Sequence, residues 1–192
     1  MHAAAAAAAL LVCLCLAGQG LAFDISPGAC PKAPTVIKKH FNVHWYTGRW
    51  YEVEAYSQIW ELGGKCSTAE YSLQKDGKVH VKNAMRFWLG NDITQEGYAE
   101  VTSENGDAEL LVTFQVPIFG KRQANYWVLA TDYETYSVVY SCTDLAGLIK
   151  FESAWILSRS PVLDDVSKVE VENAIKAAGL NRKAFKPTKQ DC

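Results

Sequence analysis

The chain has 192 residues, of which 21 are acidic and 19 are lysine or arginine, so its formal net charge is −2. This near balance argues against a nucleic-acid-binding protein, which would carry a basic excess or a basic stripe. Hydrophobic residues make up 49% of the chain, which is a globular and not a disordered composition, and the length suits one domain.

The N-terminus has the features of a secretory signal peptide. Residues 3–17 form an unbroken apolar run, and residues 20–22, Gly-Leu-Ala, have the small residues of a cleavage site. The alternative is a membrane anchor, but the run is mostly alanine and shorter than the roughly 20 apolar residues that span a bilayer. We therefore expect a secreted, extracellular protein in which residues 1–22 are removed and residues 23–192 form a single domain.

Cleavage at that point leaves four cysteines in the mature chain, Cys30, Cys66, Cys142 and Cys192. An even number of cysteines in a secreted chain indicates two disulfides, for which three connectivities are possible. The four positions are too far apart in sequence to match a zinc-binding pattern, so we expect no metal site formed by them.

Between residues 48 and 159 the sequence repeats short β-type runs separated by turns. Asp76-Gly77 and Asn105-Gly106 are strong hairpin signals. The expected strands are residues 48–57, 66–74, 78–86, 94–103, 108–116, 125–132, 135–142 and 152–159. Eight consecutive strands predict an all-β fold, an eight-stranded antiparallel up-and-down β-barrel, with a β-sandwich as the alternative on pattern alone.

A helix follows the predicted strands and is expected to pack outside the barrel. Asp164 is a suitable N-cap and Gly179 a suitable C-terminal stop. The apolar residues at helical spacing, which should form the buried face, are Val166, Val169, Ala174, Ile175 and Ala178.

Three short motifs carry a family resemblance. Gly48-Arg49-Trp50 opens the first strand, Thr131-Asp132-Tyr133 lies between the sixth and seventh, and the segment from Trp155 to Arg159 ends the eighth. In this order they resemble the three signature regions of the lipocalin family. Further segments resemble the apolipoprotein D group and the insect bilin-binding, insecticyanin-like lipocalins: Cys30-Pro31, Gly64-Lys65-Cys66, Ala69-Glu70-Tyr71, residues 127–133, Tyr140-Ser141-Cys142 and residues 154–157.

The resemblance assigns structural roles to several of these residues. It implies that Trp50 plugs the closed end of the barrel and that the guanidinium of Arg159 lies across the indole ring. Gly48, Thr131, Asp132 and Tyr133 would be structural as well. It also implies that the disulfides join Cys30 to Cys142 and Cys66 to Cys192.

Catalysis and metal binding are not expected. His40 and His44 have helical spacing but precede the barrel in an irregular segment without a paired acidic motif. One lipocalin is an enzyme, a prostaglandin synthase that uses a free cysteine, whereas the four mature cysteines here all match disulfide positions. No nucleophile-elbow motif is present either, so the sequence does not predict an enzyme.

The predicted function is to carry a small hydrophobic ligand, such as a lipid, fatty acid, sterol or retinoid-like molecule, in the barrel. Strand parity and the resemblance together give the candidate ligand-binding residues Tyr71, Asn83, Met85, Phe87, Val112, Phe114 and Trp155. For the apolar members the alternative is plain core packing. Tyr71 and Asn83 would be polar anchors for the ligand, or would bond each other or a buried water.

Other roles remain open at this point. No cofactor is required, but the resemblance makes a pigment carrier holding a biliverdin-type molecule one alternative, and an antioxidant stress protein that acts at lipid surfaces another. The four loops expected at the open end, 58–65, 87–93, 117–124 and 143–151, all carry large apolar side chains. They would either fold over the mouth or dock it onto a membrane or lipoprotein surface. We expect a monomer or a weak oligomer.

Overall fold

The computed structural model describes residues 24–57, 63–87, 90–116 and 120–192. The predicted signal peptide lies outside these ranges. Within them, no helix combines the length and the apolar character that crossing a membrane requires.

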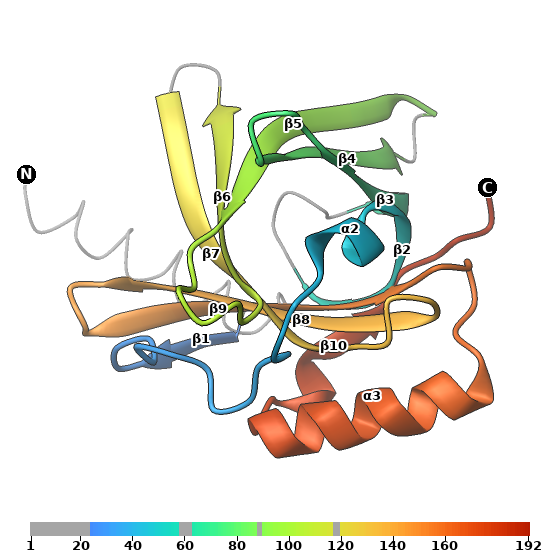
Figure 1. Ribbon diagram of the computed structural model, residues 1–192. Helices are drawn as coiled ribbons and strands as arrows, with labels where there is room; N and C mark the ends of the chain where they lie inside the picture. The colour runs from blue at the N-terminus through green and yellow to red at the C-terminus, as the bar shows by residue number, and fades with distance from the viewer. Residues whose placement is uncertain (1–23, 58–62, 88–89, 117–119) are drawn as a thin grey trace, which may run out of the picture.

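The core of the molecule is one antiparallel sheet that closes on itself as a barrel (Figure 1). Each strand pairs with the next along the chain, and β2 also pairs with β9, which completes the ring. The barrel strands are β2 (Gly48–Tyr56), β3 (Gly64–Leu73), β4 (Val79–Phe87), β5 (Asp92–Val101), β6 (Glu109–Val116), β7 (Gly120–Thr131), β8 (Tyr136–Leu145) and β9 (Ile149–Ser158). The eight-stranded up-and-down barrel is therefore confirmed, and the sandwich is excluded.

Four short elements were not predicted from the sequence: β1 (Asp24–Pro27), α2 (Val43–Tyr46), η2 (Arg182–Ala184) and β10 (Phe185–Pro187). β1 pairs with β9, and β10 pairs with β2. Strands this short have too few residues to show a hydrophobic period in the sequence. Their extended conformation depends on pairing with the longer strand that they join. In α2 the side chain of Asn42 accepts hydrogen bonds from two backbone N–H groups and caps the single turn.

The strands at the open end extend further than the sequence pattern predicted. β8 and β9 form a hairpin that pairs as far as Leu145 and Ile149, so most of the expected loop 143–151 is strand. Its turn contains Ala146 and Gly147, both with positive φ. β7 also begins earlier than expected, at Gly120. Beyond the barrel rim these strands pair with adjacent strands but have no face against the core. The sequence there therefore lacks the alternation of apolar and polar residues that predicts a strand.

Two hydrophobic clusters lie on opposite sides of the sheet. The inner cluster fills the closed half of the barrel, and its buried members are Tyr46, Trp50, Tyr71, Val79, Val81, Ala99, Ala108, Leu110, Val112, Val128, Val139 and Leu157. The outer cluster lies between the sheet and α3 (Asp165–Ala178) and includes Tyr56, Trp127, Leu129, Val138, Tyr140, Ile156, Val171, Ala174, Ile175 and Phe185. The strands shared by both clusters are therefore buried on two faces.

Helix α3 lies outside the barrel, as predicted, with Asp164 as its N-cap and Gly179 in the left-handed conformation at its end. The predicted buried face was wrong in its first turns, because Val166 and Val169 are 77% and 58% exposed. Ser167 and Val171 are buried in their place. The Ser167 hydroxyl lies 2.8 Å from Thr135 Oγ1 and 2.6 Å from the Asp164 carboxylate, so this turn of the helix faces the barrel through polar contacts, which hydrophobic periodicity does not detect.

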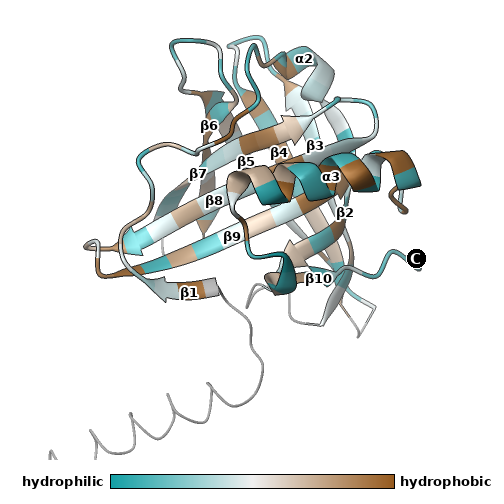
Figure 2. Ribbon diagram, turned by 90° about the horizontal axis from the view of Figure 1, so that it is seen from below, coloured by the Kyte–Doolittle hydropathy of each residue, from teal (hydrophilic) through white to brown (hydrophobic). Residues whose placement is uncertain are grey.

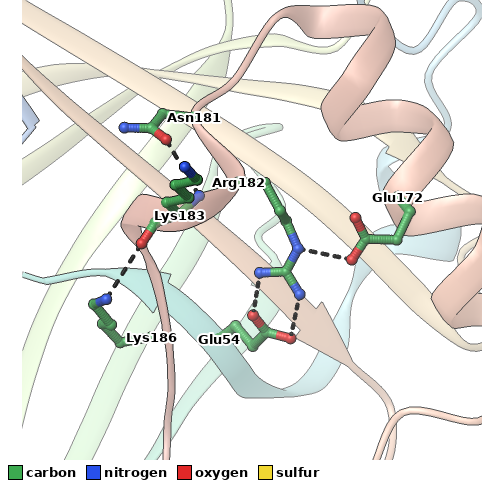
Figure 3. Close-up of polar contacts among 6 residues, drawn as sticks. All are labelled: Glu54, Glu172, Asn181, Arg182, Lys183 and Lys186. Atoms are coloured by element: carbon green, nitrogen blue, oxygen red, sulfur yellow. Dashed lines mark hydrogen bonds and ion pairs between the residues drawn. The ribbon is translucent and has the colours of Figure 1, made fainter.

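The chain after α3 is held to the outside of β2 by one arginine (Figure 3). Arg182 donates to both carboxylate oxygens of Glu54 on β2, at 2.6 and 3.1 Å, and to Glu172 on α3 at 2.7 Å. A bidentate pair of this kind fixes geometry as well as distance. Helix, C-terminal segment and barrel wall are therefore tied together at this point.

Two disulfides fasten the ends of the chain to the barrel. Cys30 is bonded to Cys142 on β8, with Cα atoms 5.8 Å apart, and Cys66 on β3 is bonded to Cys192, with Cα atoms 6.2 Å apart. These are the pairs that the family resemblance implies. They join residues 112 and 126 positions apart, for which chain entropy gives a stabilisation of roughly 4–5 kcal/mol each.

The closed end of the barrel is sealed by Arg159 and Trp50. The guanidinium carbon lies 3.7 Å from the centroid of the fully buried indole ring. The same guanidinium donates to three backbone carbonyls, those of Tyr133, Arg49 and Trp45, at 2.9–3.0 Å. Arg159 thus joins the end of β9 to the start of β2, to α2 and to the β7–β8 turn.

Neighbouring signature residues shape the same end. A Cβ on Gly48, which has a φ of 92°, would lie 3.3 Å from Arg159 Nη1, so glycine both permits the backbone and leaves room for the guanidinium. Asp132 Oδ1 accepts from the N–H groups of Glu134, Thr135 and Tyr136 and so folds the β7–β8 turn. Although partial burial opposes it, hydrogen bonding from Thr135 and this backbone lowers the pKa of Asp132.

Replacing Arg159 by Lys should lower the free energy of unfolding by about 2–4 kcal/mol, because lysine keeps the charge but loses the planar fork that stacks on Trp50 and reaches three carbonyls. Urea unfolding measures the change. Arg49→Lys is the matched control, since Arg49 is exposed and pairs with the exposed Glu70, so its loss should stay within about 1 kcal/mol. Equal losses in both variants would contradict the sealing role.

Candidate ligand-binding cavity

The register of the strands shows which side chains face the barrel interior. Residues paired across an antiparallel sheet point to the same side. On β4 the members of the inner cluster are Val79 and Val81, and the same face continues through Asn83, Met85 and Phe87 toward the open end. On β6 it includes Leu110, Val112 and Phe114, and on β9 it includes Leu157 and Trp155.

Burial along this inner face changes with depth. Near the closed end Trp50, Val128 and Val139 have no exposed surface. Toward the open end Ala69, Phe114, Tyr126 and Trp155 point inward and pack against the inner cluster but are only partly buried. Inward side chains are therefore less completely packed in the upper half of the barrel than at the closed end, and this upper half is the candidate cavity, above a packed floor.

All seven predicted ligand residues have the register of the inner face. Tyr71 and Val112 belong to the buried inner cluster, and Phe114 and Trp155 pack against it. Asn83, Met85 and Phe87 are partly buried and lie outside that cluster, progressively nearer the mouth. Met85 also borders a groove of about 380 Å³ on the outer side of the sheet, together with Ala84 and Arg86.

Tyr71 and Asn83 do not bond each other. Tyr71 has its hydroxyl 2.9 Å from the hydroxyl of Tyr126 on β7. The side chain of Asn83 makes no hydrogen bond with any residue that the structure describes, and it pairs in register with Ala69 and Gln95. Of the two predicted anchors, Asn83 is therefore the one on the inner face without a side-chain hydrogen bond to the described residues.

A hydrogen-bonded group of tyrosines forms the floor of the cavity. Tyr46 from α2 lies with its hydroxyl 3.2 Å from that of Tyr126 and 2.8 Å from Ser137 Oγ, and Tyr126 in turn reaches Tyr71. Burial raises the pKa of Tyr46 to about 12 and also raises those of Tyr71 and Tyr126, so all three phenols stay neutral at physiological pH. The rings of Tyr126 and Trp155 are stacked, with an angle of 22° between their planes.

Tyr46 and Tyr126 were not among the site residues predicted from the sequence. Tyr126 has the parity of Val128 on β7, so inward alternation was a usable signal for it. Tyr46 had none, because it lies on a four-residue helix whose position under the barrel is purely tertiary.

Three comparisons with known proteins agree on the family. A family model described as a lipocalin-like domain matches residues 41–190. The chain belongs to the lipocalin family. It is 40% identical to apolipoprotein D of Bos taurus over 147 residues, 77% of this chain and 74% of that protein. It is 34% identical to insecticyanin-A of Manduca sexta over 158 residues, 78% of this chain and 79% of that one.

A solved structure supports the same conclusion. Insecticyanin from the tobacco hornworm Manduca sexta superimposes on this lipocalin with a TM-score of 0.77 and 27% sequence identity, covering 87% of this chain and 89% of that one. The resemblance drawn from the three signature motifs is therefore confirmed for the family and for these relatives.

Other features of this lipocalin bear on the cavity and on metal binding. Gly97 on β5 lies under Phe114: a Cβ at Gly97 would overlap the Thr113 carbonyl and come within 2.6 Å of the Phe114 ring. Phe114 can lie across the inner wall only because position 97 has no side chain. In the described ranges, Cys66, Cys192 and Asp191 bring potential metal-ligand atoms together, but the two sulfurs form a disulfide and so are not thiolate ligands.

Tyr126→Phe should lower the free energy of unfolding by about 1–3 kcal/mol, because it leaves the buried Tyr71 hydroxyl without its partner. The effect should depend on pH. Burial raises the pKa of Tyr126 on folding, so its contribution to native-state stability is complete below the ordinary value of 10.0 and is lost as the pH rises above it. Urea unfolding of the wild type and of Tyr126→Phe, at neutral pH and across this alkaline range, tests both points. If the free energy of unfolding falls with pH at the same slope in the two proteins, Tyr126 is not among the titrating groups.

Proposed function

We propose that this lipocalin binds a small hydrophobic ligand in the upper half of its barrel and carries it outside the cell. The observation that carries the proposal is the depth profile of the inner face, on which inward side chains stay partly exposed above a fully packed floor. The predicted signal peptide and the two disulfides support an extracellular location. Neither the tyrosine floor nor the disulfide-bonded cysteines supply an activated nucleophile, which favours binding over catalysis.

Binding would work by burial in a site that exists before the ligand arrives. Each Å² of apolar ligand surface removed from water is worth about 25 cal/mol, and rigid aromatic walls reduce the entropy lost on binding. Phe114, Tyr126 and Trp155 supply such walls from three strands. Asn83 supplies an amide that donates to a carbonyl or carboxylate and accepts from a hydroxyl, and so orients the ligand.

A pigment is the second candidate cargo. The rings of Tyr126 and Trp155 lie 6.4 Å apart between centroids with 22° between their planes, and such neighbouring aromatic rings suit contact with a planar conjugated molecule such as a biliverdin-type pigment. The resemblance to the insect bilin-binding lipocalins supports this reading. Protein purified from its source would absorb visible light if it carried a pigment, and a colourless protein would favour a lipid, a sterol or a fatty acid.

Trp155→Phe should weaken binding of the fluorescent probe anilinonaphthalene sulfonate by about three- to tenfold and reduce energy transfer from tryptophan to the bound probe. Trp45→Phe is the control, because Trp45 is 66% exposed at the closed end and should leave both signals unchanged. If Trp155→Phe behaves as Trp45→Phe does, Trp155 does not line the binding site.

The open end also presents an apolar surface, on the β8–β9 hairpin and β1. Ile25 pairs with Phe151, and Leu145 pairs with Ile149, so these side chains share one face, and Leu148 lies in the turn between the two strands. All five are exposed, Leu148 by 72%, and the hairpin tip is brown in Figure 2. The other three predicted docking loops lie partly outside the described residues. An apolar face that continues the rim of the cavity suits docking onto a membrane or lipoprotein surface, from which the ligand would pass to the barrel.

Replacing Leu145 and Leu148 by Ser should reduce co-sedimentation with phosphatidylcholine vesicles by about tenfold, since each exposed leucine contributes up to about 1.5 kcal/mol when buried. The matched control replaces the equally exposed Val166 and Val169 on α3 by Ser, and should bind as the wild type does. Absence of vesicle binding by the wild type would end the docking proposal but would leave the cavity proposal intact.

A further inference from the structure

A carboxyl group is buried in the barrel wall at Glu52. Glu52 pairs with Leu157 across β2 and β9, and Leu157 belongs to the inner cluster, so the glutamate is on the inner side of the sheet. It lies on β2 two residues beyond Trp50, on the side of the open end. Only 8% of its surface is accessible.

The wall beside Glu52 is built by the C-terminal segment. Direct pairing of β2 with β3 ends at Tyr51 and Thr68. Beyond that point Thr188 N–H donates to the Val53 carbonyl at 3.0 Å, and Cys66 N–H donates to the Lys189 carbonyl at 2.7 Å. The tail therefore fills the gap between the two strands as a strip of polar wall.

Two tail side chains complete this polar strip. Gln190 Nε2 donates to the carbonyls of Glu52 and Ser67, at 2.8 and 2.9 Å. Thr188 Oγ1 donates to Glu52 Oε1 at 2.5 Å. The Cys66–Cys192 disulfide and the Arg182 contacts hold the segment at both ends.

Glu52 has no counter-charge in the described part of the chain. Glu54 pairs with Arg182, and the half-buried Glu152 pairs with Lys150 and accepts from Tyr140, whereas the hydroxyl of Thr188 is the one side-chain partner found for Glu52. Burial raises the pKa of Glu52, and the bond from Thr188 opposes that shift. A buried carboxylate is costly unless a cation or several hydrogen bonds compensate it.

We propose that Glu52 recognises the cargo, by anchoring a protonated amine on an otherwise hydrophobic ligand. The inference rests on the proposed carrier function and adds the chemical class of the ligand. An ammonium beside Glu52 supplies the missing counter-charge and donates to the carboxylate in a site of low dielectric, where such a bond is strongest. The apolar part of the ligand then lies along Trp155 and Phe114 toward the mouth.

The same carboxyl disfavours the commonest alternative cargo. A fatty-acid carboxylate that reached this depth would place a second negative charge beside Glu52. A long-chain alcohol is intermediate, since its hydroxyl donates one hydrogen bond without charge. The inward register on β7 also includes the cation Arg122, but Arg122 pairs with Phe114 nearer the mouth and is exposed.

The test uses three probes with one alkyl chain, dodecylamine, dodecanol and dodecanoate, below their aggregation concentrations. Each displaces anilinonaphthalene sulfonate from the disulfide-bonded protein at neutral pH. In the wild type the amine should bind about tenfold or more tighter than the carboxylate, with the alcohol between them. Glu52→Gln keeps the shape and should bring the three affinities within about threefold of one another.

Two controls separate the carboxyl from its surroundings. Glu70→Gln removes one negative charge from the outer face of β3 and should leave the amine preference unchanged, which excludes a net-charge effect. Thr188→Val disturbs the polar strip but keeps the carboxyl, so it should keep the preference as well. Circular dichroism and the melting temperature establish that each variant is folded.

The possible outcomes are distinct. The proposal is supported if Glu52→Gln loses the amine preference while Glu70→Gln and Thr188→Val keep it. Equal binding of the three probes by the wild type, or a preference that survives in Glu52→Gln, overturns it and leaves the carrier function standing. If no probe displaces the dye from the wild type, both the amine anchor and the carrier function are wrong.

Discussion

The contact of Arg159 with Trp50 is the interaction on which the rest of the barrel depends. One guanidinium covers the indole and binds carbonyls from α2, β2 and the β7–β8 turn, so a single side chain fixes the ends of several segments. Because this end is closed and its inner side chains are fully buried, the less tightly packed part of the interior lies at the other end. The proposed direction of ligand entry is thus a consequence of how the first and last barrel strands are locked together.

The chain outside the eight strands is part of the barrel and not an appendage to it. The tail after α3 replaces β3 as the neighbour of β2 in the part of the wall nearer the open end, and Arg182 and the Cys66–Cys192 disulfide hold it there. Long-range tethers of this kind contribute stability by restricting the unfolded chain. They also decide the surroundings of Glu52, since Thr188 and Gln190, which bond its side chain and its backbone carbonyl, come from the last residues of the sequence.

Polar groups inside the barrel fall into two kinds. The phenols of Tyr46, Tyr71 and Tyr126 are hydrogen-bonded through their hydroxyls. These bonds compensate the free-energy cost of removing the hydroxyls from water, and the three rings make a rigid floor. Among the described residues Asn83 has no side-chain hydrogen bond and Glu52 has one, from Thr188, and an incompletely compensated polar group at a cavity wall favours ligands that complement it. In the proposed function, structure and selectivity therefore belong to different polar residues of the same inner face.

The sequence by itself determined the fold, because strand alternation, hairpin turns and three short motifs are local signals that all indicate one topology. It also placed Asn83, Phe114 and Trp155 on the inner face, since parity along a strand needs no tertiary information. It did not determine the helix rotation that leaves Val166 exposed, the position of Tyr46 or the strip formed by Thr188 and Gln190. Those depend on contacts between residues up to 138 positions apart, as in the bond from Gln190 to Glu52, and no local period encodes a contact of that range.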